Sequence, residues 1–288
     1  MPAMSYRSVF RPGLFAGQSV IVTGGGSGIG RCTAHELAAL GAHVVLVGRT
    51  VARLEAVAAE IGEDGGEASH FACDIRDEEA VKATVAGALA ARGRIHGLVN
   101  NAGGQFPAAL AGISARGWQA VIANNLTGGF LMARECYNQC MRAHGGAIVN
   151  MLADMWMGMP GMGHSGAARA GMLNFTETAA CEWAPVRVNA VAPGWIASSG
   201  MDTYPDAMKP LIQSLPRHVP AARLGTEAEV SAAIVFLLSE AASFISGACL
   251  RIDGAAPNAR RHWMMAGGQP SPEFDGFHRS RKPRVLEP

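Results

Sequence analysis

From residue 18 onward, short apolar runs alternate with longer helix-like segments, and this alternation constrains the fold more than any other feature. The helix-like segments include 31–40, 51–61 and 77–92. The apolar runs are nearly continuous, which is typical of strands buried on both faces of a parallel sheet. They cover residues 19–23, 43–47, 69–73, 97–100, 147–151, 186–191 and 249–253. The pattern predicts a doubly wound α/β fold with a parallel seven-stranded sheet and right-handed crossovers.

The chain of 288 residues is predicted to form one domain with an extension at each end. We expect an N-terminal arm over 1–16, the α/β domain over 17–257 and a C-terminal extension over 258–288. Four prolines punctuate the stretch from Met201 to Pro220, and residues 203–220 are expected to form a mobile substrate flap.

The C-terminal extension is basic. It holds six Lys or Arg residues and three Asp or Glu residues, which give a net charge of +3. The rest of the chain holds 18 Lys or Arg residues and 20 Asp or Glu residues, which give a net charge of −2. Two interpretations stay open: the extension packs on a neighbouring subunit, or it forms a basic clamp for a phosphorylated substrate. The basic residues are Arg260, Arg261, Arg279, Arg281, Lys282 and Arg284.

Composition narrows the class of protein. The formal net charge of +1 is incompatible with a strongly basic nucleic-acid binder, so no nucleic-acid partner is expected. The six cysteines form no CxxC pair, and no metal site is assigned. The N-terminus lacks the apolar run of about 7–15 residues that a secretory signal needs, and no apolar stretch reaches the roughly 18 residues of a membrane span. We expect a cytoplasmic protein without a membrane partner.

A glycine-rich turn joins the first predicted strand to the first helix, and it reads Thr23-Gly24-Gly25-Gly26-Ser27-Gly28-Ile29-Gly30. Glycines at these positions permit a tight turn and a close approach of the backbone to a diphosphate. The helix N-terminus then offers free N–H donors to the phosphates. We therefore predict a Rossmann-type fold with a dinucleotide site built from Gly24, Ser27, Gly28, Ile29 and Gly30.

The end of the second predicted strand bears on the choice of cofactor. An acidic residue here would bind the 2′-hydroxyl of the adenosine ribose and select NAD. This sequence has Gly48 at that position, followed by Arg49. Because a guanidinium makes bidentate contacts with phosphate, Arg49 favours NADP(H) over NAD(H).

Four further motifs follow later predicted strands, and with the glycine turn they resemble the short-chain dehydrogenase/reductase family over residues 15–257. They are Cys73-Asp74-Ile75, Asn100-Asn101-Ala102-Gly103, Asn124-Asn125-Leu126-Thr127-Gly128 and Pro193-Gly194-Trp195-Ile196-Ala197-Ser198. The order of the motifs along the chain is also the order found in the family.

The resemblance implies roles for particular residues. Asp74 matches the residue that contacts the adenine ring, and Ile75 beside it and Asn101 belong to the same cofactor site. Asn125 matches the active-site asparagine. The last motif implies a nicotinamide carboxamide site formed by Pro193, Gly194, Ile196 and Ser198.

Two stretches resemble one group within the family, the trans-2-enoyl-CoA reductases of peroxisomes. These are Asn100-Asn101-Ala102-Gly103-Gly104-Gln105-Phe106 and His164-Ser165-Gly166-Ala167-Ala168-Arg169-Ala170-Gly171. A looser likeness links the chain to bacterial dehydrogenases of citronellol-type terpenoid alcohols. The resemblance also implies a homotetramer, in which the helices carrying Asn125 and Arg169 pack against those of a second subunit.

The sequence departs from the family at the residues that transfer protons. Most members carry a serine and a YxxxK pair, but alignment places Ser165 at the tyrosine position and Arg169 at the lysine position. The usual serine falls near Ala153 or Asp154, and the tyrosine that enoyl reductases carry four residues after the arginine is Leu173 here. Of the three tyrosines, Tyr6 precedes the predicted fold, Tyr137 lies late in a helix, and Tyr204 of the flap alone can turn toward a substrate.

These departures favour one reaction over another. Oxidation of an alcohol needs a base for the hydroxyl proton, and a serine without an adjacent base performs this poorly. Reduction of a C=C bond conjugated to a thioester mainly needs donors that stabilise an enolate-like oxygen. Ser165, Arg169 and a backbone N–H can supply them, and Arg169 can also hold the ribose. The sequence therefore favours enoyl reduction.

Two other residues could transfer the proton in the oxidation of an alcohol. His164 is a possible acid/base because an unperturbed histidine titrates near pH ~6.5; facing a subunit interface or capping the helix is the alternative role. Asp154 follows the fifth predicted strand, where it can orient His164 or a substrate hydroxyl. An Asp154–His164 pair would support an alcohol dehydrogenase.

Five methionines lie between Met151 and Met162. Flexible thioethers adapt to an acyl or isoprenoid chain, and they equally fill an irregular core. Three hypotheses follow: an NADPH-dependent reductase of a hydrophobic enoyl-CoA-like substrate, a dehydrogenase of a medium-chain or terpenoid alcohol, and an NADP-binding scaffold without full catalysis.

Overall fold

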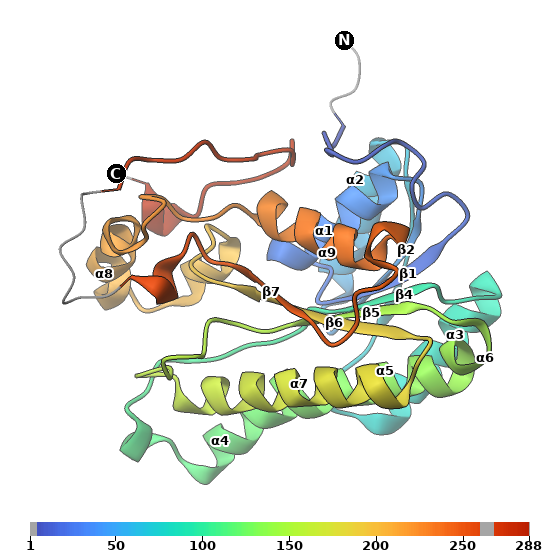
Figure 1. Ribbon diagram of the computed structural model, residues 1–288, viewed down its shortest axis with the longest axis horizontal. Helices are drawn as coiled ribbons and strands as arrows, with labels where there is room; N and C mark the ends of the chain where they lie inside the picture. Colours follow the sequence, from blue (N-terminus) through green and yellow to red (C-terminus); the bar gives the residue numbers. More distant parts are fainter. Residues whose placement is uncertain (1–4, 260–267, 288) are drawn as a thin grey trace.

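A computed structural model of the chain describes residues 5–259 and 268–287. Its centre is a parallel sheet of seven strands in the order β3-β2-β1-β4-β5-β6-β7 (Figure 1), which confirms the predicted doubly wound Rossmann-type sheet. The strands are β1 (Ser19–Thr23), β2 (His43–Gly48), β3 (Glu67–Ala72), β4 (Gly97–Asn100), β5 (Ala147–Met151), β6 (Arg187–Pro193) and β7 (Cys249–Ile252).

The two edge strands differ from the sequence-based expectation. The run 69–73 was expected to be buried on both faces, but β3 begins two residues earlier, at Glu67, and is half-exposed along most of its length. β7 is also only partly buried. Both strands have a neighbour on one side only, so polar side chains there keep contact with water.

Helices cover both faces of the sheet (Figure 1). α1, α2 and α9 pack on one face, and α3, α5 and α7 pack on the other. The described residues contain α1 (Gly28–Ala39), α2 (Val51–Glu63), α3 (Glu78–Arg92), α4 (Ala115–Ile122), α5 (Gly128–Cys136), α6 (Arg142–His144), α7 (Gly163–Glu182), α8 (Lys209–Ser214) and α9 (Glu227–Leu238). A π-helical stretch, Ala123–Thr127, joins α4 to α5.

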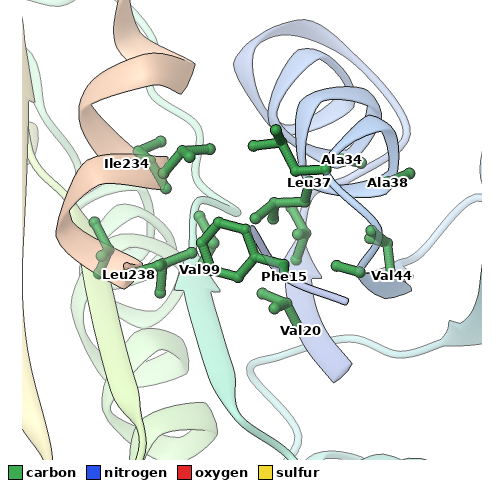
Figure 2. Packing of buried hydrophobic residues seen from close by; sticks show 14 of the residues in the cluster. Phe15, Val20, Ala34, Leu37, Ala38, Val44, Val99, Ile234 and Leu238 are labelled. Atoms are coloured by element: carbon green, nitrogen blue, oxygen red, sulfur yellow. The ribbon is translucent and has the colours of Figure 1, made fainter. Parts of the chain in front are cut away.

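The main core lies between α1, α9 and the sheet. Figure 2 shows the ring of Phe15 packed among side chains from β1, β4, α1 and α9. Phe15 is 1% exposed although it belongs to the predicted N-terminal arm. Tyr6 is also buried, and its hydroxyl donates to the Glu36 carboxylate at 3.2 Å. Residues 5–16 are therefore packed on the domain, and Tyr6 is part of the fold rather than ahead of it.

The described part of the C-terminal extension packs on its own chain. Phe277 is 1% exposed beside Tyr6 and α1. The guanidinium of Arg279 pairs with Asp64 at 2.8 Å and with Glu63 at 2.9 Å at the end of α2. The apolar and acidic partners of Phe277 and Arg279 lie on the same domain, and packing on a neighbouring subunit stays a prediction. Arg260 and Arg261, two residues of the predicted basic clamp, lie outside the described residues.

The predicted flap consists of short helical turns around α8. Its apolar side chains, among them Ile212 and Leu215, pack with Val285 and Leu286 of the C-terminal extension. The backbone N–H of Val285 also donates to the Asp202 carboxylate at 3.1 Å. The extension thus supports the segment that follows β6.

Candidate active site

The predicted site residues gather at the carboxyl ends of the strands. The strand order reverses between β1 and β4, and a crevice opens at such a switch point in doubly wound sheets. The loops that follow β1, β2, β3 and β4 line one pocket there. Its walls consist of Gly24, Gly26, Ser27, Gly48, Arg49, Thr50, Arg53, Leu54, Cys73, Asp74, Ile75, Ala102, Gly103 and Asn124.

The glycine turn is held against the end of β4. The Asn101 carboxamide donates to the Thr23 carbonyl oxygen at 3.0 Å, and the Thr23 hydroxyl oxygen accepts the Asn101 and Ala102 N–H groups. A Cβ on Gly24 would lie 2.8 Å from Asn101 Nδ2, and a Cβ on Gly30 would lie 2.4 Å from the same atom. Only glycine fits these two positions, so Asn101 shapes the turn.

The start of α1 fits an anion. α1 begins at Gly28, whose φ is +57°, and within the described chain the Ser27 side chain makes no capping hydrogen bond. The first N–H groups of the helix, at Gly28, Ile29 and Gly30, have no side-chain acceptor among the described residues, and Ser27 just before them lines the crevice. This arrangement fits the diphosphate of a dinucleotide cofactor.

The far end of the pocket is rich in arginine. Arg49 and Arg53 line it. The Asp74 carboxylate accepts hydrogen bonds from the Arg76 guanidinium at 2.8 and 2.5 Å, and this contact holds the pKa of Asp74 at about 2. Arg76 went unnoticed in the sequence because nothing in its spacing connects it to a motif. Three guanidinium groups and one carboxylate give this end a positive charge suited to a phosphate.

Arg169 and Asn125 meet at the other end of the crevice. Arg169 is 9% exposed; its guanidinium donates to the Met151 carbonyl oxygen at 2.5 Å and to Asn125 Oδ1 at 2.9 Å. Burial lowers the pKa of Arg169 to about 10, so the group is charged at neutral pH. No carboxylate of residues 5–259 or 268–287 forms an ion pair with it. A buried cation without a counter-ion attracts negative charge that develops nearby.

Asn125 is fixed from several sides. Its amide donates to the carbonyl oxygens of Gly104 at 2.6 Å and Val121 at 3.0 Å, and its Oδ1 accepts the Gly104 N–H. A Cβ on Gly103 would lie 2.6 Å from Asn125 Oδ1 and 2.7 Å from Arg169 Nη2. The loop after β4 therefore lies directly on the asparagine and the guanidinium.

Ser165 lies one turn before Arg169 on α7. It is fully buried, and its hydroxyl donates to Gln105 Oε1 at 2.6 Å. Gln105 in turn donates from Nε2 to the Tyr204 hydroxyl at 3.1 Å. Sequence reasoning missed Gln105, because the contact joins residues 60 positions apart.

His164 has a different environment from the one a catalytic base needs. Its ring is fully buried and lies edge-on to Phe106, with ring centroids 4.5 Å apart. Nδ1 accepts the backbone N–H of Ser165 at 3.0 Å. Nε2 is buried and has no partner among the described residues. The imidazole thus contacts the backbone of Ser165 and not its hydroxyl.

Asp154 lies near the end of β7 and not near His164. Burial raises its pKa, the nearby Asp253 adds to this rise, and Arg251 opposes it. These neighbours belong to the end of β7, whereas the neighbours of His164 are Phe106 and Ser165. The structure does not bring Asp154 and His164 together, so the acid–histidine pair is not formed.

The loop after β6 carries the predicted nicotinamide-binding residues. Pro193 ends β6, and Gly194 lies so close to Asp253 that a Cβ would be 2.9 Å away. Ile196 pairs with Gly225, and the Ala197 N–H donates to the Gly225 carbonyl oxygen at 2.8 Å, so the loop is fixed to the segment just before α9. The position of a Cβ on Gly28 is 3.8 Å from the Ser199 hydroxyl, so this loop passes the start of α1.

Glu227, the first residue of α9, is a second residue that the sequence did not single out. Its carboxylate lies 3.8 Å from where a Cβ on Gly28 would be, and it accepts the backbone N–H of Ser199. Burial raises its pKa to about 7. A titratable carboxyl group therefore borders the predicted diphosphate site.

Comparison with known proteins agrees with this geometry. A family profile described as Enoyl-(Acyl carrier protein) reductase matches residues 24–255. The chain belongs to the short-chain dehydrogenase/reductase family. Among curated members, the peroxisomal 2,4-dienoyl-CoA reductase of Rattus norvegicus is 35% identical over 257 residues, which cover 87% of each chain.

Solved structures of family members are also similar. A citronellol catabolism dehydrogenase of Pseudomonas aeruginosa PAO1 is 66% identical, with a TM-score of 0.79 over 87% of this chain and 99% of that chain. A structure from Beutenbergia cavernae with bound NADP is 34% identical, with a TM-score of 0.80 over 86% of this chain and all of that chain (100%). This chain is therefore an oxidoreductase of the family, whose fold binds NAD(P).

No group of His, Cys, Asp and Glu side chains in the described ranges is arranged to hold a metal ion. Over the same ranges, every helix is too short or too polar to cross a bilayer.

Proposed function

We propose that this protein is an NADPH-dependent reductase of a hydrophobic enoyl thioester, such as an enoyl-CoA. One observation carries the proposal: the residue at the family's tyrosine position, Ser165, hydrogen-bonds to a neutral amide, while the nearby Arg169 is a buried cation without a carboxylate partner. Arg169 can stabilise an anion, whereas Ser165 has no base among the described residues in contact with its hydroxyl.

The two candidate reactions make different demands on such a set. An alcohol loses its proton as hydride leaves, so its oxidation requires a group that accepts a proton near neutral pH. A serine bound to an amide oxygen does not meet this requirement. Reduction of a conjugated C=C bond places negative charge on the thioester oxygen, where the charge of Arg169 would lower the barrier.

The cofactor part of the proposal rests on the arginine-rich end of the pocket. When bound, NADPH supplies the hydride. Arg49 and Arg53 line the pocket where the second strand ends, and Gly48 leaves that position without a carboxylate. Guanidinium groups there would hold a 2′-phosphate. The diphosphate would lie on Gly28 and its neighbours at the start of α1, and Ser198 and Asn125 would flank the nicotinamide.

A hydrophobic substrate is supported by the side chains around the crevice. Four large apolar residues on loops at the carboxyl ends of the strands are exposed by 39 to 82%. They are Phe106, Trp156, Met157 and Trp195. Exposed apolar side chains in one region indicate a surface for an apolar ligand.

A second candidate is the oxidation of a medium-chain or terpenoid alcohol. The 66% identity with a citronellol catabolism dehydrogenase favours it. In that case the proton would have to leave through a group other than His164, whose imidazole is buried and bonded to the backbone. A third candidate is a scaffold that binds NADPH and turns over nothing.

A set of substrates separates the three candidates. Purified protein is mixed with NADPH and with crotonyl-CoA, a longer enoyl-CoA or citronellal, and separately with NADP⁺ and citronellol, while the absorbance of NADPH is followed. We expect consumption of NADPH with the enoyl-CoA substrates. Turnover of citronellal and citronellol alone would replace the proposal with the alcohol dehydrogenase, and tight NADPH binding without any turnover would favour the scaffold.

We also propose that the protein forms a homotetramer and lies in the cytoplasm. The tetramer would be packed through the helices that carry Asn125 and Arg169, namely the stretch from α4 to α5 and α7. Light scattering during size-exclusion chromatography measures the mass of the particle and tests this part directly.

A further inference from the structure

Three side chains from three distant segments form a chain of hydrogen bonds beside Arg169. Ser165 of α7 donates to Gln105 Oε1 at 2.6 Å, and Gln105 Nε2 donates to the hydroxyl of Tyr204 at 3.1 Å. Gln105 follows β4, and Tyr204 lies in the segment after β6. Ser165 is fully buried, whereas Tyr204 is only half-buried. The chain therefore runs from the interior of the site to its open side.

The direction of these bonds decides which hydroxyl can donate a proton. A hydroxyl has one proton to give, and that of Ser165 is engaged by Gln105. Tyr204 accepts from Gln105 and donates to no acceptor in residues 5–259 or 268–287, so its own proton stays uncommitted within this part of the chain. If the carboxamide turned by half a rotation, both bonds would reverse and the proton of Ser165 would become free instead. Gln105 therefore ensures that one of the two hydroxyls keeps a proton for a ligand.

The length of the side chains explains why Gln105 and Tyr204 are needed beyond Ser165. A serine hydroxyl is attached directly to Cβ, so Ser165 is shorter than the tyrosine it replaces by a whole aromatic ring. The carboxamide of Gln105 occupies the space beyond the hydroxyl, and the phenol of Tyr204 follows it. A phenol thus reaches the site from the flap rather than from α7.

We infer that Tyr204 is the proton donor of the reaction and that Gln105 is the residue that positions it. The inference rests on the proposed function. Hydride from NADPH forms a C–H bond at Cβ of the enoyl thioester, and the C=C electron pair moves toward the thioester oxygen. The phenolic proton of Tyr204 then forms the C–H bond at Cα, and the phenolate regains a proton from water. One NADPH and one proton are consumed for each C=C bond reduced.

Among the described residues, His164 and Asp154 do not compete for this role. Nδ1 of His164 is bonded to the Ser165 backbone, and Asp154 lies with Arg251 and Asp253. The charged groups that line the same surface hollow as Tyr204 are Asp202, Asp206, Lys209 and Arg284. Of these, Asp202 is engaged by the N–H of Val285, so the C-terminal extension anchors the segment that carries the tyrosine.

Three single variants test the inference. Tyr204→Phe removes only the hydroxyl, and we expect kcat with crotonyl-CoA to fall by about 100-fold while KM and the Kd of NADPH stay within about two-fold. Tyr137→Phe is the matched control, because Tyr137 stacks on Trp183 away from the site, with ring centroids 4.6 Å apart. The control is expected to keep wild-type kcat.

Gln105→Glu tests the positioning role without a change of size. An ionised carboxylate accepts from both hydroxyls and leaves neither proton free, so kcat is expected to fall at least about ten-fold near neutral pH. Protonation restores one donor, so the activity of this variant rises relative to wild type as the pH falls toward about 4. A residue with a merely structural role would give no such difference in pH profile.

The outcomes separate this inference from the proposed function. Wild-type turnover of enoyl-CoA with an unchanged kcat in Tyr204→Phe overturns the inference and leaves the function intact. If the wild type reduces only citronellal, the proposed function fails, and the same variants on citronellal then decide whether Tyr204 donates to the carbonyl oxygen. Absence of turnover on every substrate overturns both.

Discussion

Arg169 on α7 donates a hydrogen bond of 2.9 Å to the carboxamide oxygen of Asn125, which lies in the π-helical stretch between α4 and α5. The contact joins α7 to the π-helical stretch and fixes a buried cation between them. In the family pattern a lysine occupies this position. The guanidinium keeps the charge, and its second amino group donates to the Met151 carbonyl oxygen at the end of β5.

The first prediction concerns the charge of Arg169. Arg169→Met removes a buried donor and cation close to the developing negative charge, so we expect kcat for enoyl-CoA reduction to fall by about 100-fold or more. Arg169→Lys keeps the charge and is expected to lose about ten-fold or less. Steady-state kinetics of both variants measure the difference. Equal losses in the two variants would mean that hydrogen-bond geometry, not charge, is what the reaction requires.

The second prediction concerns cofactor choice. Arg49→Asp replaces a guanidinium in the pocket by a carboxylate, which repels a 2′-phosphate and can bind a 2′-hydroxyl. We expect the Kd of NADPH to rise by about ten-fold or more and that of NADH to stay the same or fall. Fluorescence titration with both cofactors measures this, and Arg11→Ala, an exposed residue outside the pocket, is the control. An equal change for NADPH and NADH would remove Arg49 from the 2′-phosphate site.

Much of the fold was predictable because buried parallel strands carry an unbroken apolar pattern. β1, β4 and β5 begin and end at the predicted residues. β3 does not, because Glu67, Ser69 and His70 on an edge strand dilute that pattern. The glycine turn and its partner Asn101 were likewise predictable, since contiguous motifs report local backbone geometry.

The proton-transfer residues were less predictable, because their contacts span long separations in the chain. Gln105 and Tyr204 are 99 positions apart, and neither lies in a periodic segment that would place it. The pairing of His164 with Asp154 was inferred from positions near one sheet edge. The side chains have different neighbours, since Arg251 of β7 and Asp253 just after it lie near Asp154. Spacing alone carries no information about such orientations.

The third prediction concerns pH and stability. Burial raises the pKa of Glu227 from 4.5 to about 7, so between these values the folded protein holds a proton that the unfolded chain releases. The free energy of unfolding therefore falls as the pH rises through this window, by up to about 3 kcal/mol from this group. Glu227→Gln removes this dependence and should be the more stable protein at pH ~8.

Urea unfolding at several pH values measures this difference. Glu240→Gln, which changes an exposed carboxylate, is the control and should follow the wild type. If the free energy of unfolding depends on pH in the same way in wild type and in Glu227→Gln, Glu227 does not titrate in this window.

The fourth prediction concerns the C-terminal extension. Phe277 is 1% exposed and packs on Tyr6 at a ring-centroid distance of 5.7 Å, on His35 at 5.0 Å and under the Arg31 guanidinium. Phe277→Ala leaves a cavity there, and we expect the free energy of unfolding to fall by about 3 kcal/mol. Phe244→Ala is the control: Phe244 is fully exposed, and its loss should change stability by less than about 0.5 kcal/mol.

Thermal and urea unfolding at two protein concentrations check this prediction. Because Phe277 contacts residues of its own chain, the loss of stability is expected to be the same at both concentrations. A loss that shrinks as the protein concentration rises would instead indicate that the extension is stabilised by a neighbouring subunit. An unchanged Tm in Phe277→Ala would show that residues 268–287 contribute little to holding α1 and the flap in place.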